Sequence, residues 1–181
     1  IKSSKRKILW VGNGAKFATE EVNLFIKMGF AVVTSTQGRG VVSETNKMCL
    51  GAFNAVPIIE EFYKTLDLMI VVGSRLRGHE TRDMSLELPK KIVQIDVDPS
   101  AQNRTYKTNE FHCGDAKKVL AELVKRLAGK ISVENEWIDE VSNLKRQIYL
   151  DYKNMLGAYK NFPEIIRNIL PKDGKWVRDV T

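Results

Sequence analysis

The stretch Thr34-Ser35-Thr36-Gln37-Gly38-Arg39-Gly40-Val41 comes at the end of an apolar segment, residues 30–34, which predicts a buried strand. A second glycine turn, Gly12-Asn13-Gly14, follows another apolar segment over residues 7–11. Short apolar strands that end in glycine are typical of parallel sheets whose two faces are both covered by helices. The two stretches therefore predict an α/β fold built on a parallel sheet.

The rest of the chain continues this alternation of strands and helices. We expect a Rossmann-like, doubly wound parallel sheet of about five or six strands with helices on both faces. Further strands are expected at 68–72, 92–97, 110–113 and, beginning near Trp176, at 176–180, and one helical turn in the polar segment 78–89. Helices are expected at 15–28, 57–66, 115–128, 134–159 and 162–170, the last with Asn161 as its N-cap.

The strand ends carry glycine or acidic residues in a fixed order along the chain. After the two glycine turns come Leu50-Gly51, Val71-Val72-Gly73-Ser74-Arg75, Gln94-Ile95-Asp96-Val97-Asp98-Pro99 and Gly114-Asp115-Ala116. In this order and spacing the motifs resemble the central domain of thiamine-diphosphate-dependent enzymes, the family of acetolactate synthase, benzoylformate decarboxylase and oxalyl-CoA decarboxylase. The resemblance covers roughly residues 7–127.

The resemblance implies a central Rossmann-like domain over residues 1–130, a helical linker over 131–160 and the truncated start of a diphosphate-binding domain over 161–181. It implies a longer cytoplasmic enzyme, a homodimer or homotetramer, that decarboxylates a 2-keto acid or joins two carbonyl compounds as a lyase or transferase. The missing N-terminal pyrimidine-binding and C-terminal diphosphate-binding domains would hold thiamine diphosphate and Mg²⁺. By itself this segment would be inactive, so no catalytic residue is assigned to it.

Two other classes of protein stay open beside this one. A stand-alone nucleotide-binding regulatory module would bind its ligand without partner domains. A self-sufficient NAD-dependent enzyme would carry the GxGxxG fingerprint and an acid at the end of the second strand. The chain has Phe17 where the third glycine belongs and Ser35, Thr36 and Gln37 in place of the acid, and both departures count against NAD.

Candidate ligand-binding residues lie where the first two predicted strands end. Gly12-Asn13-Gly14 forms a strand-to-helix turn that either receives a pyrophosphate or is a tight turn without a ligand. The resemblance places the loop containing Thr36 and Gly38 beside the cofactor cleft. Arg39 is expected there as a flexible cation that meets either a phosphate or water.

The third and fourth strand ends supply the other candidates. Arg75 matches the arginine that approaches the flavin in flavin-binding members, whereas Arg77 stands where those members have a carboxylate. The resemblance therefore suits ADP, CoA or no ligand at least as well as FAD. Asp96 ends its strand where family members place an acid near the adenosine ribose, with a turn cap as the alternative. Gly114 and Asp115 would add contacts at the same rim, and Asp115 is also expected to cap the following helix.

The composition argues against nucleic-acid binding, a membrane span and a zinc site, but it does not identify a function. The chain is 43% apolar and 28% charged, with a net charge of +7. Its basic residues are scattered among acids rather than grouped with aromatic residues, so we expect no nucleic-acid partner. No apolar run reaches the ~18 residues of a membrane span. Cys49 and Cys113 are far apart and lack histidine partners at the spacing of a zinc site, so no metal site is assigned.

The predicted helix over 134–159 has apolar residues at steps of four and three, which indicate a single amphipathic stripe. Such a stripe must pack on something. Either the helix folds back onto the sheet domain, or it crosses as a linker to a neighbouring domain, and the resemblance favours the linker.

Overall fold

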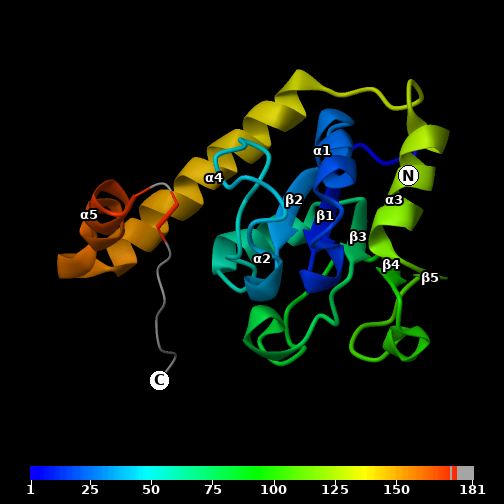
Figure 1. Cartoon of the computed structure of the whole chain (residues 1–181), viewed down its shortest axis with the longest axis horizontal. Coiled ribbons are helices and arrows are strands. Elements are labelled where there is room, and N and C mark those ends of the chain that lie inside the picture. The colour runs from blue at the N-terminus through cyan, green and yellow to red at the C-terminus, as the bar shows by residue number, and fades with distance from the viewer. Residues whose placement is uncertain (172, 175–181) are drawn as a thin grey trace.

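A computed structural model describes residues 1–171, 173 and 174 of the chain (Figure 1). Its centre is a five-stranded, fully parallel sheet in the order β2-β1-β3-β4-β5. This confirms the predicted α/β class and the parallel sheet. The strands are β1 (Lys7–Val11), β2 (Ala31–Thr34), β3 (Leu68–Val72), β4 (Ile92–Asp96) and β5 (Glu110–Cys113).

Helices cover both faces of the sheet because alternate strand residues point to opposite sides. On one face, Leu9 and Val11 belong to a core that α1 (Thr19–Lys27) and α3 (Ala116–Leu127) close. On the other face, Ile8 and Trp10 belong to a core that α2 (Pro57–Lys64) and α4 (Asn135–Met155) close. Strands β1, β3 and β4 are completely buried, as expected of the central strands of a parallel sheet covered on both faces.

The strand order reverses at β1, and this decides where a ligand can approach. The chain runs from β1 to β2 on one side and then crosses back to β3 on the other side. Crevices at such a switch point, outside the carboxyl ends of the strands, are the usual ligand sites of open parallel sheets. Here the crevice lies beyond Val11 and Val72, which pair with each other in the sheet.

The first helix begins later than the sequence pattern predicts. A 3₁₀ turn, η1 (Asn13–Ala15), follows β1, and α1 starts only at Thr19. The helix predicted over 15–28 starts too early because Ala15 in the turn and Ala18 at the N-cap of α1 are both buried, which suits a helical face equally well. Gly29, with φ of 81°, ends the helix as expected.

The long helix α4 folds back onto the sheet domain with its first turns. Its residues Trp137, Val141 and Ile148 are buried in the same core as α2. Figure 1 shows the helix then running outward to α5 (Phe162–Ile169). The fold-back alternative therefore holds for the beginning of α4, and its last turns leave Tyr149 and Met155 exposed.

The contact between α4 and α5 differs from the predicted capping. Asn161 precedes α5, but its side chain makes no capping hydrogen bond. Glu164, the acid in the first turn of α5, instead accepts hydrogen bonds from the Tyr149 hydroxyl and from Lys153 Nζ, the latter at 2.9 Å. The predicted N-cap position and the start of the helix at Phe162 are confirmed, but the Asn161 side chain makes no capping hydrogen bond, and Glu164 binds partners on α4 instead. The strand expected at 176–180 lies outside the described residues.

Candidate functional site

A pocket of about 560 Å³ lies at the carboxyl edge of the sheet, at the switch point between β1 and β3. It is formed by the turns that follow β1, β2 and β3 and by the end of β4. Of the residues predicted from the sequence it gathers Asn13, Gly14, Thr36, Arg75 and Asp96. Ser35, Gln37, Gly73, Ser74, Leu76, Arg77, His79 and Glu80 complete its lining.

The glycines at this edge are required because backbones touch there. A Cβ on Gly12 would lie 2.2 Å from the carbonyl oxygen of Gly73, and a Cβ on Gly38 would lie 2.2 Å from that of Val11. Gly14 meets Gly73 in the same way, at 2.7 Å from its Cα. The tight-turn explanation accounts for Gly12 and Gly38, which do not line the pocket, whereas Gly14 both packs on Gly73 and lines it.

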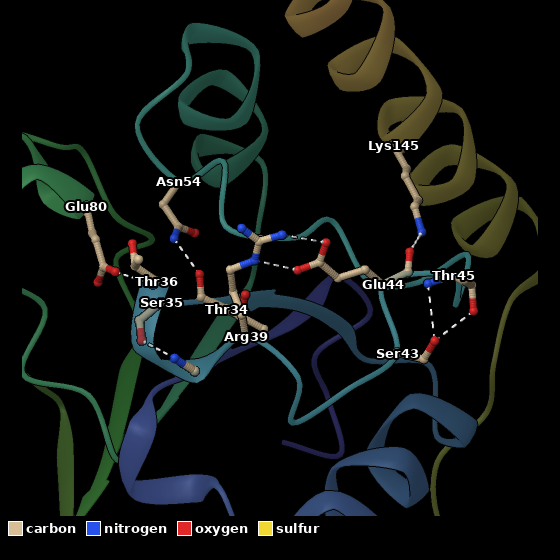
Figure 2. A network of polar contacts seen from close by, with 11 residues as sticks. Thr34, Ser35, Thr36, Arg39, Ser43, Glu44, Thr45, Asn54, Glu80 and Lys145 are labelled. Atoms are coloured by element: carbon tan, nitrogen blue, oxygen red, sulfur yellow. Dashed lines mark hydrogen bonds and ion pairs between the residues drawn. The ribbon is translucent and has the colours of Figure 1, made fainter. Parts of the chain in front are cut away.

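The loop after β2 closes one rim of the pocket. Ser35 Oγ accepts a hydrogen bond from the backbone N–H of Gly38 at 2.9 Å, which fixes the 3₁₀ turn η2 (Thr36–Gly38). The backbone N–H of Thr36 donates to the carboxylate of Glu80, which comes from the opposite rim (Figure 2). Sequence reasoning missed Glu80, although it lies in the polar segment 78–89, whose one predicted helical turn is η3 (Gly78–Thr81).

Two arginines give the pocket its positive charge. Arg75 is partly engaged, because its Nη2 lies 3.4 Å from Asp98 Oδ2 across the turn that follows β4. Arg77 is exposed and makes no ion pair with any residue that the structure describes. The free guanidinium is a donor group suited to a phosphate or carboxylate on a ligand.

One carboxylate oxygen of Asp96 caps the turn that follows β4. Its Oδ1 accepts the backbone N–H of Asp98 at 3.0 Å, and Asp98 in turn accepts that of Ser100 at 2.9 Å. The hydrogen bonds from Ser100 hold the pKa of Asp98 below its ordinary value. Asp96 is only 9% exposed, yet it lines the pocket.

Gly114 and Asp115 lie apart from the pocket. Gly114 N–H donates to the carbonyl of Asp96 at 2.8 Å and thereby continues the pairing of β5 with β4. Asp115 Oδ1 accepts the backbone N–H of Lys118 at 3.0 Å, which confirms it as the N-cap of α3. Neither residue is among those that line the pocket, and both have these structural roles.

Arg39 is not the flexible cation that the sequence suggested. Its Nε and Nη2 donate to the two carboxylate oxygens of Glu44 at 2.8 and 3.2 Å, and this pairing raises the pKa of Arg39 (Figure 2). The pair lies at a second pocket, of about 710 Å³, between the loop and the α4–α5 end of the chain. No sequence signal marked this pocket, because its walls are brought together only by the packing of α4.

Lys145 of α4 fixes the same loop. Its Nζ donates to the carbonyl of Glu44 (Figure 2) and to that of Asn46, the latter at 2.7 Å. Burial lowers the pKa of Lys145 from its ordinary value. One loop, residues 35–56, therefore lines the pocket at the sheet edge with its first residues and contacts α4 with its middle.

The described residues offer no site for a metal ion. They contain no group of three or more His, Cys, Asp or Glu side chains that could bind one. Cys49 and Cys113 are both free thiols, and burial raises the pKa of Cys49. In the part of the chain that the structure describes, no helix is both apolar and long enough to span a bilayer.

Comparison with known proteins adds a family to this geometry. The family model described as the thiamine pyrophosphate enzyme, central domain, matches residues 1–123. A probable acetolactate synthase large subunit of Methanococcus aeolicus is 30% identical over 162 residues, which is 81% of this chain and 27% of that protein. The acetolactate synthase large subunit of Corynebacterium glutamicum is 29% identical over 167 residues, covering 87% of this chain and 26% of that protein.

A relative of a different kind aligns over the whole chain. The probable 2-ketoarginine decarboxylase of Pseudomonas aeruginosa is 24% identical over 182 aligned positions, which is 100% of this chain and 33% of that protein. The chain thus spans between 26% and 33% of the length of these three relatives.

Proposed function

The chain belongs to the family of thiamine pyrophosphate enzyme central domains, and on that premise we propose that it is a non-catalytic domain that binds an adenosine diphosphate moiety at the carboxyl edge of its sheet. The moiety is shared by ADP, FAD and CoA, so one site chemistry serves all three. The whole enzyme, related to acetolactate synthases, would decarboxylate a 2-keto acid or join two carbonyl compounds.

The observation that carries the proposal is the position of a free cation in the switch-point pocket. Arg77 is exposed, lines the pocket and has no ion-pair partner among the residues described. Arg75 lies two residues away, held by Asp98. A diphosphate bound between the two guanidinium groups would give Arg77 an anionic partner and accept charge-assisted hydrogen bonds from it.

Asp96 gives the other end of the ligand a partner. In dinucleotide folds a carboxylate at the end of the second strand accepts hydrogen bonds from the ribose hydroxyls, and Asp96 would offer the same acceptor chemistry from the end of β4. The pocket of about 560 Å³ is within the range of small-molecule and cofactor sites. In this assignment the arginines hold the phosphates, Asp96 orients the ribose, and Gly14 admits the ligand close to the backbone.

Thiamine diphosphate and Mg²⁺ are assigned to other parts of the proposed enzyme. The described residues contain no group of three or more His, Cys, Asp or Glu side chains that could hold a metal ion, and we assign no catalytic step to this domain. Its contribution to the whole enzyme is architectural, between a pyrimidine-binding and a diphosphate-binding domain, in a homodimer or homotetramer in the cytoplasm.

Thermal unfolding with ligands tests the proposal directly. ADP, FAD, CoA, NAD and thiamine diphosphate with Mg²⁺ are added in turn to the chain. A ligand present at about 100 times its Kd stabilises the fold by about 2.7 kcal/mol, which raises Tm by several degrees. A shift with ADP, FAD or CoA that is lost in Arg77→Ala but kept in Lys125→Ala, an exposed cation on α3, supports the site.

Two other results would contradict it. A shift with NAD alone would identify a nicotinamide dinucleotide site instead. Absence of a shift with ADP, FAD and CoA at millimolar concentration would leave the domain as a scaffold without a nucleotide. A larger shift with FAD than with ADP would show that the isoalloxazine is bound as well.

A further inference from the structure

One segment, residues 77–85, borders the switch-point pocket, and one of its side chains reaches the opposite rim. It lies between Leu76 and Leu86, which are both buried. Between them the chain is largely exposed. Glu80 reaches from this segment over the pocket to the backbone N–H of Thr36 on the far rim (Figure 2).

The backbone of this segment is held in an unfavourable conformation. Leu76, Arg82, Asp83 and Met84 have φ between 46° and 72°, the left-handed region that residues other than glycine rarely occupy. Three of the four are consecutive, and no helix or strand holds them. Left-handed backbone of this kind persists where surrounding contacts hold it, and it is common at clamps and switch segments.

The buried residue Thr81 and a small number of polar contacts hold the segment in place. The Thr81 hydroxyl lies 3.4 and 3.3 Å from the carbonyls of Leu76 and Gly78, both within the same segment. On its outer side Arg82 pairs with Glu60 of α2. Across the pocket, the Glu80–Thr36 hydrogen bond is the contact that joins the two rims.

We propose that residues 77–85 form a lid over the switch-point pocket and that Glu80 is the latch that holds the lid closed on Thr36. The inference rests on the proposed function, because it concerns access to the same pocket. A ligand that enters must release Glu80 from Thr36, so the closed population lowers the apparent affinity.

Tryptic cleavage of the native chain tests the lid without any ligand. Arg77 and Arg82 lie on the lid with exposed side chains, and trypsin cleaves after them only when the backbone around them opens into an extended form, so the cleavage rate reports the open population. Glu80→Ala should raise the rate about five- to tenfold, the change expected for loss of one hydrogen bond of ordinary net strength. Glu87→Ala removes the same charge from the neighbouring sequence outside the pocket and should leave the rate unchanged.

Two further variants separate the hydrogen bond from the charge. Glu80→Gln keeps an oxygen that accepts from Thr36 and should stay close to the unmodified chain. Glu80→Asp keeps the charge but shortens the reach, and should behave like Glu80→Ala. Equal cleavage of Glu80→Ala and the unmodified chain would overturn the latch, as would a Glu80→Asp variant that stays closed.

ADP binding by calorimetry then distinguishes this inference from the proposed function. If the pocket binds ADP behind the lid, Glu80→Ala should lower the Kd by about five- to tenfold while Glu87→Ala does not. If ADP binds with the same Kd to both, the lid does not control access and the inference fails while the site stands. If no variant binds ADP, FAD or CoA although Glu80→Ala is cleaved faster, the nucleotide site fails while the latch stands.

Discussion

Arg6 and Glu140, 134 residues apart in the chain, form a two-bond ion pair in which Nη1 and Nη2 each donate to a carboxylate oxygen at 2.6 Å. The guanidinium carbon also lies 4.9 Å from the ring centroid of Trp137, one helical turn earlier in α4. Arg6, the residue just before β1, therefore fixes the first turns of α4 against the sheet domain. This contact explains why α4 begins its course against the sheet.

Trp137 is the apolar part of that anchor, and its loss should be costly. It is 6% exposed, stacks on Phe62 with ring centroids 5.6 Å apart, and donates its Nε1–H to the carbonyl of Gly29 at 2.8 Å. We expect Trp137→Ala to lower the free energy of unfolding in urea by about 3–5 kcal/mol. Tyr159→Ala, which truncates a ring that is 72% exposed, should change it by less than about 0.5 kcal/mol. A loss below about 1 kcal/mol in Trp137→Ala would show that α4 is not part of the folding unit.

The ion pair itself should contribute less than the ring. The side chains of Arg6 and Glu140 are 30% and 44% exposed, so solvent and salt screen their attraction. A double-mutant cycle with Arg6→Ala and Glu140→Ala should give a coupling free energy of about 1 kcal/mol, because the geometry is bidentate. Arg6→Lys should lose most of that coupling although it keeps the charge. A coupling that does not weaken in molar salt would contradict an electrostatic origin.

The sequence predicted the sheet well because buried parallel strands leave a strong local signal. The runs at Leu68–Val72 and Glu110–Cys113 have the predicted bounds in the structure. Asp115 was identified correctly as a cap, because an acid before an apolar helical stripe has a local meaning. Features of this kind depend on residues a few positions apart in the sequence, so they can be predicted without knowledge of the fold.

The candidate site was harder to predict because its parts come from distant segments. Sequence reasoning found the strand ends that hold Asn13, Thr36 and Arg75, since topology brings carboxyl ends of parallel strands together. It missed that Arg39 would be paired by Glu44, five residues on, in a loop of no regular pattern. It also missed Glu80, whose partner is a backbone N–H that no side-chain pattern reveals.

Lys145 should determine how firmly the loop after β2 is held. Its Nζ donates to two backbone carbonyls, those of Glu44 and Asn46, where the loop has no strand or helix partner. Lys145→Met keeps the length of the side chain but leaves both carbonyls without this donor, and should cost about 1–2 kcal/mol. Amide exchange in Lys145→Met should accelerate in residues 42–48 and stay unchanged in α3. The control variant Lys160→Met, at an exposed residue between α4 and α5, should change exchange in neither. Equal protection of the loop in both variants would show that Lys145 is not its anchor.

Two glycines of the same loop should tolerate alanine very differently. A Cβ at Gly38 meets the carbonyl oxygen of Val11 at 2.2 Å, whereas a Cβ at Gly40 meets nothing within 4 Å. Gly40 has φ of 89°, so Gly40→Ala carries only a conformational cost of about 1 kcal/mol. Gly38→Ala must move β1 and the loop apart and should cost about 3 kcal/mol or more. Urea unfolding of the two variants compares them, and a smaller loss for Gly38→Ala would disprove the close backbone contact.

Acidification should release α5 from α4 through Glu164. The hydrogen bonds from Tyr149 and Lys153 lower the pKa of Glu164 from its ordinary value. A carboxyl whose folded pKa lies below the unfolded value of about 4.3 contributes stability that is fully present above that value. The contribution is lost as the pH falls through the folded pKa, so amide exchange in α5, after correction for its intrinsic pH dependence, should rise relative to α3 on acidification below about pH 4.3.

The variant Glu164→Gln isolates this carboxylate from the other acids that titrate in the same range. It should make α5 exchange faster at neutral pH and remove most of the extra pH dependence, because the amide no longer changes charge. Glu136→Gln changes an exposed acid in the first turn of α4 and should keep the behaviour of the unmodified chain. If α5 of Glu164→Gln still loses protection on acidification as the unmodified chain does, the docking of α5 depends on groups other than Glu164.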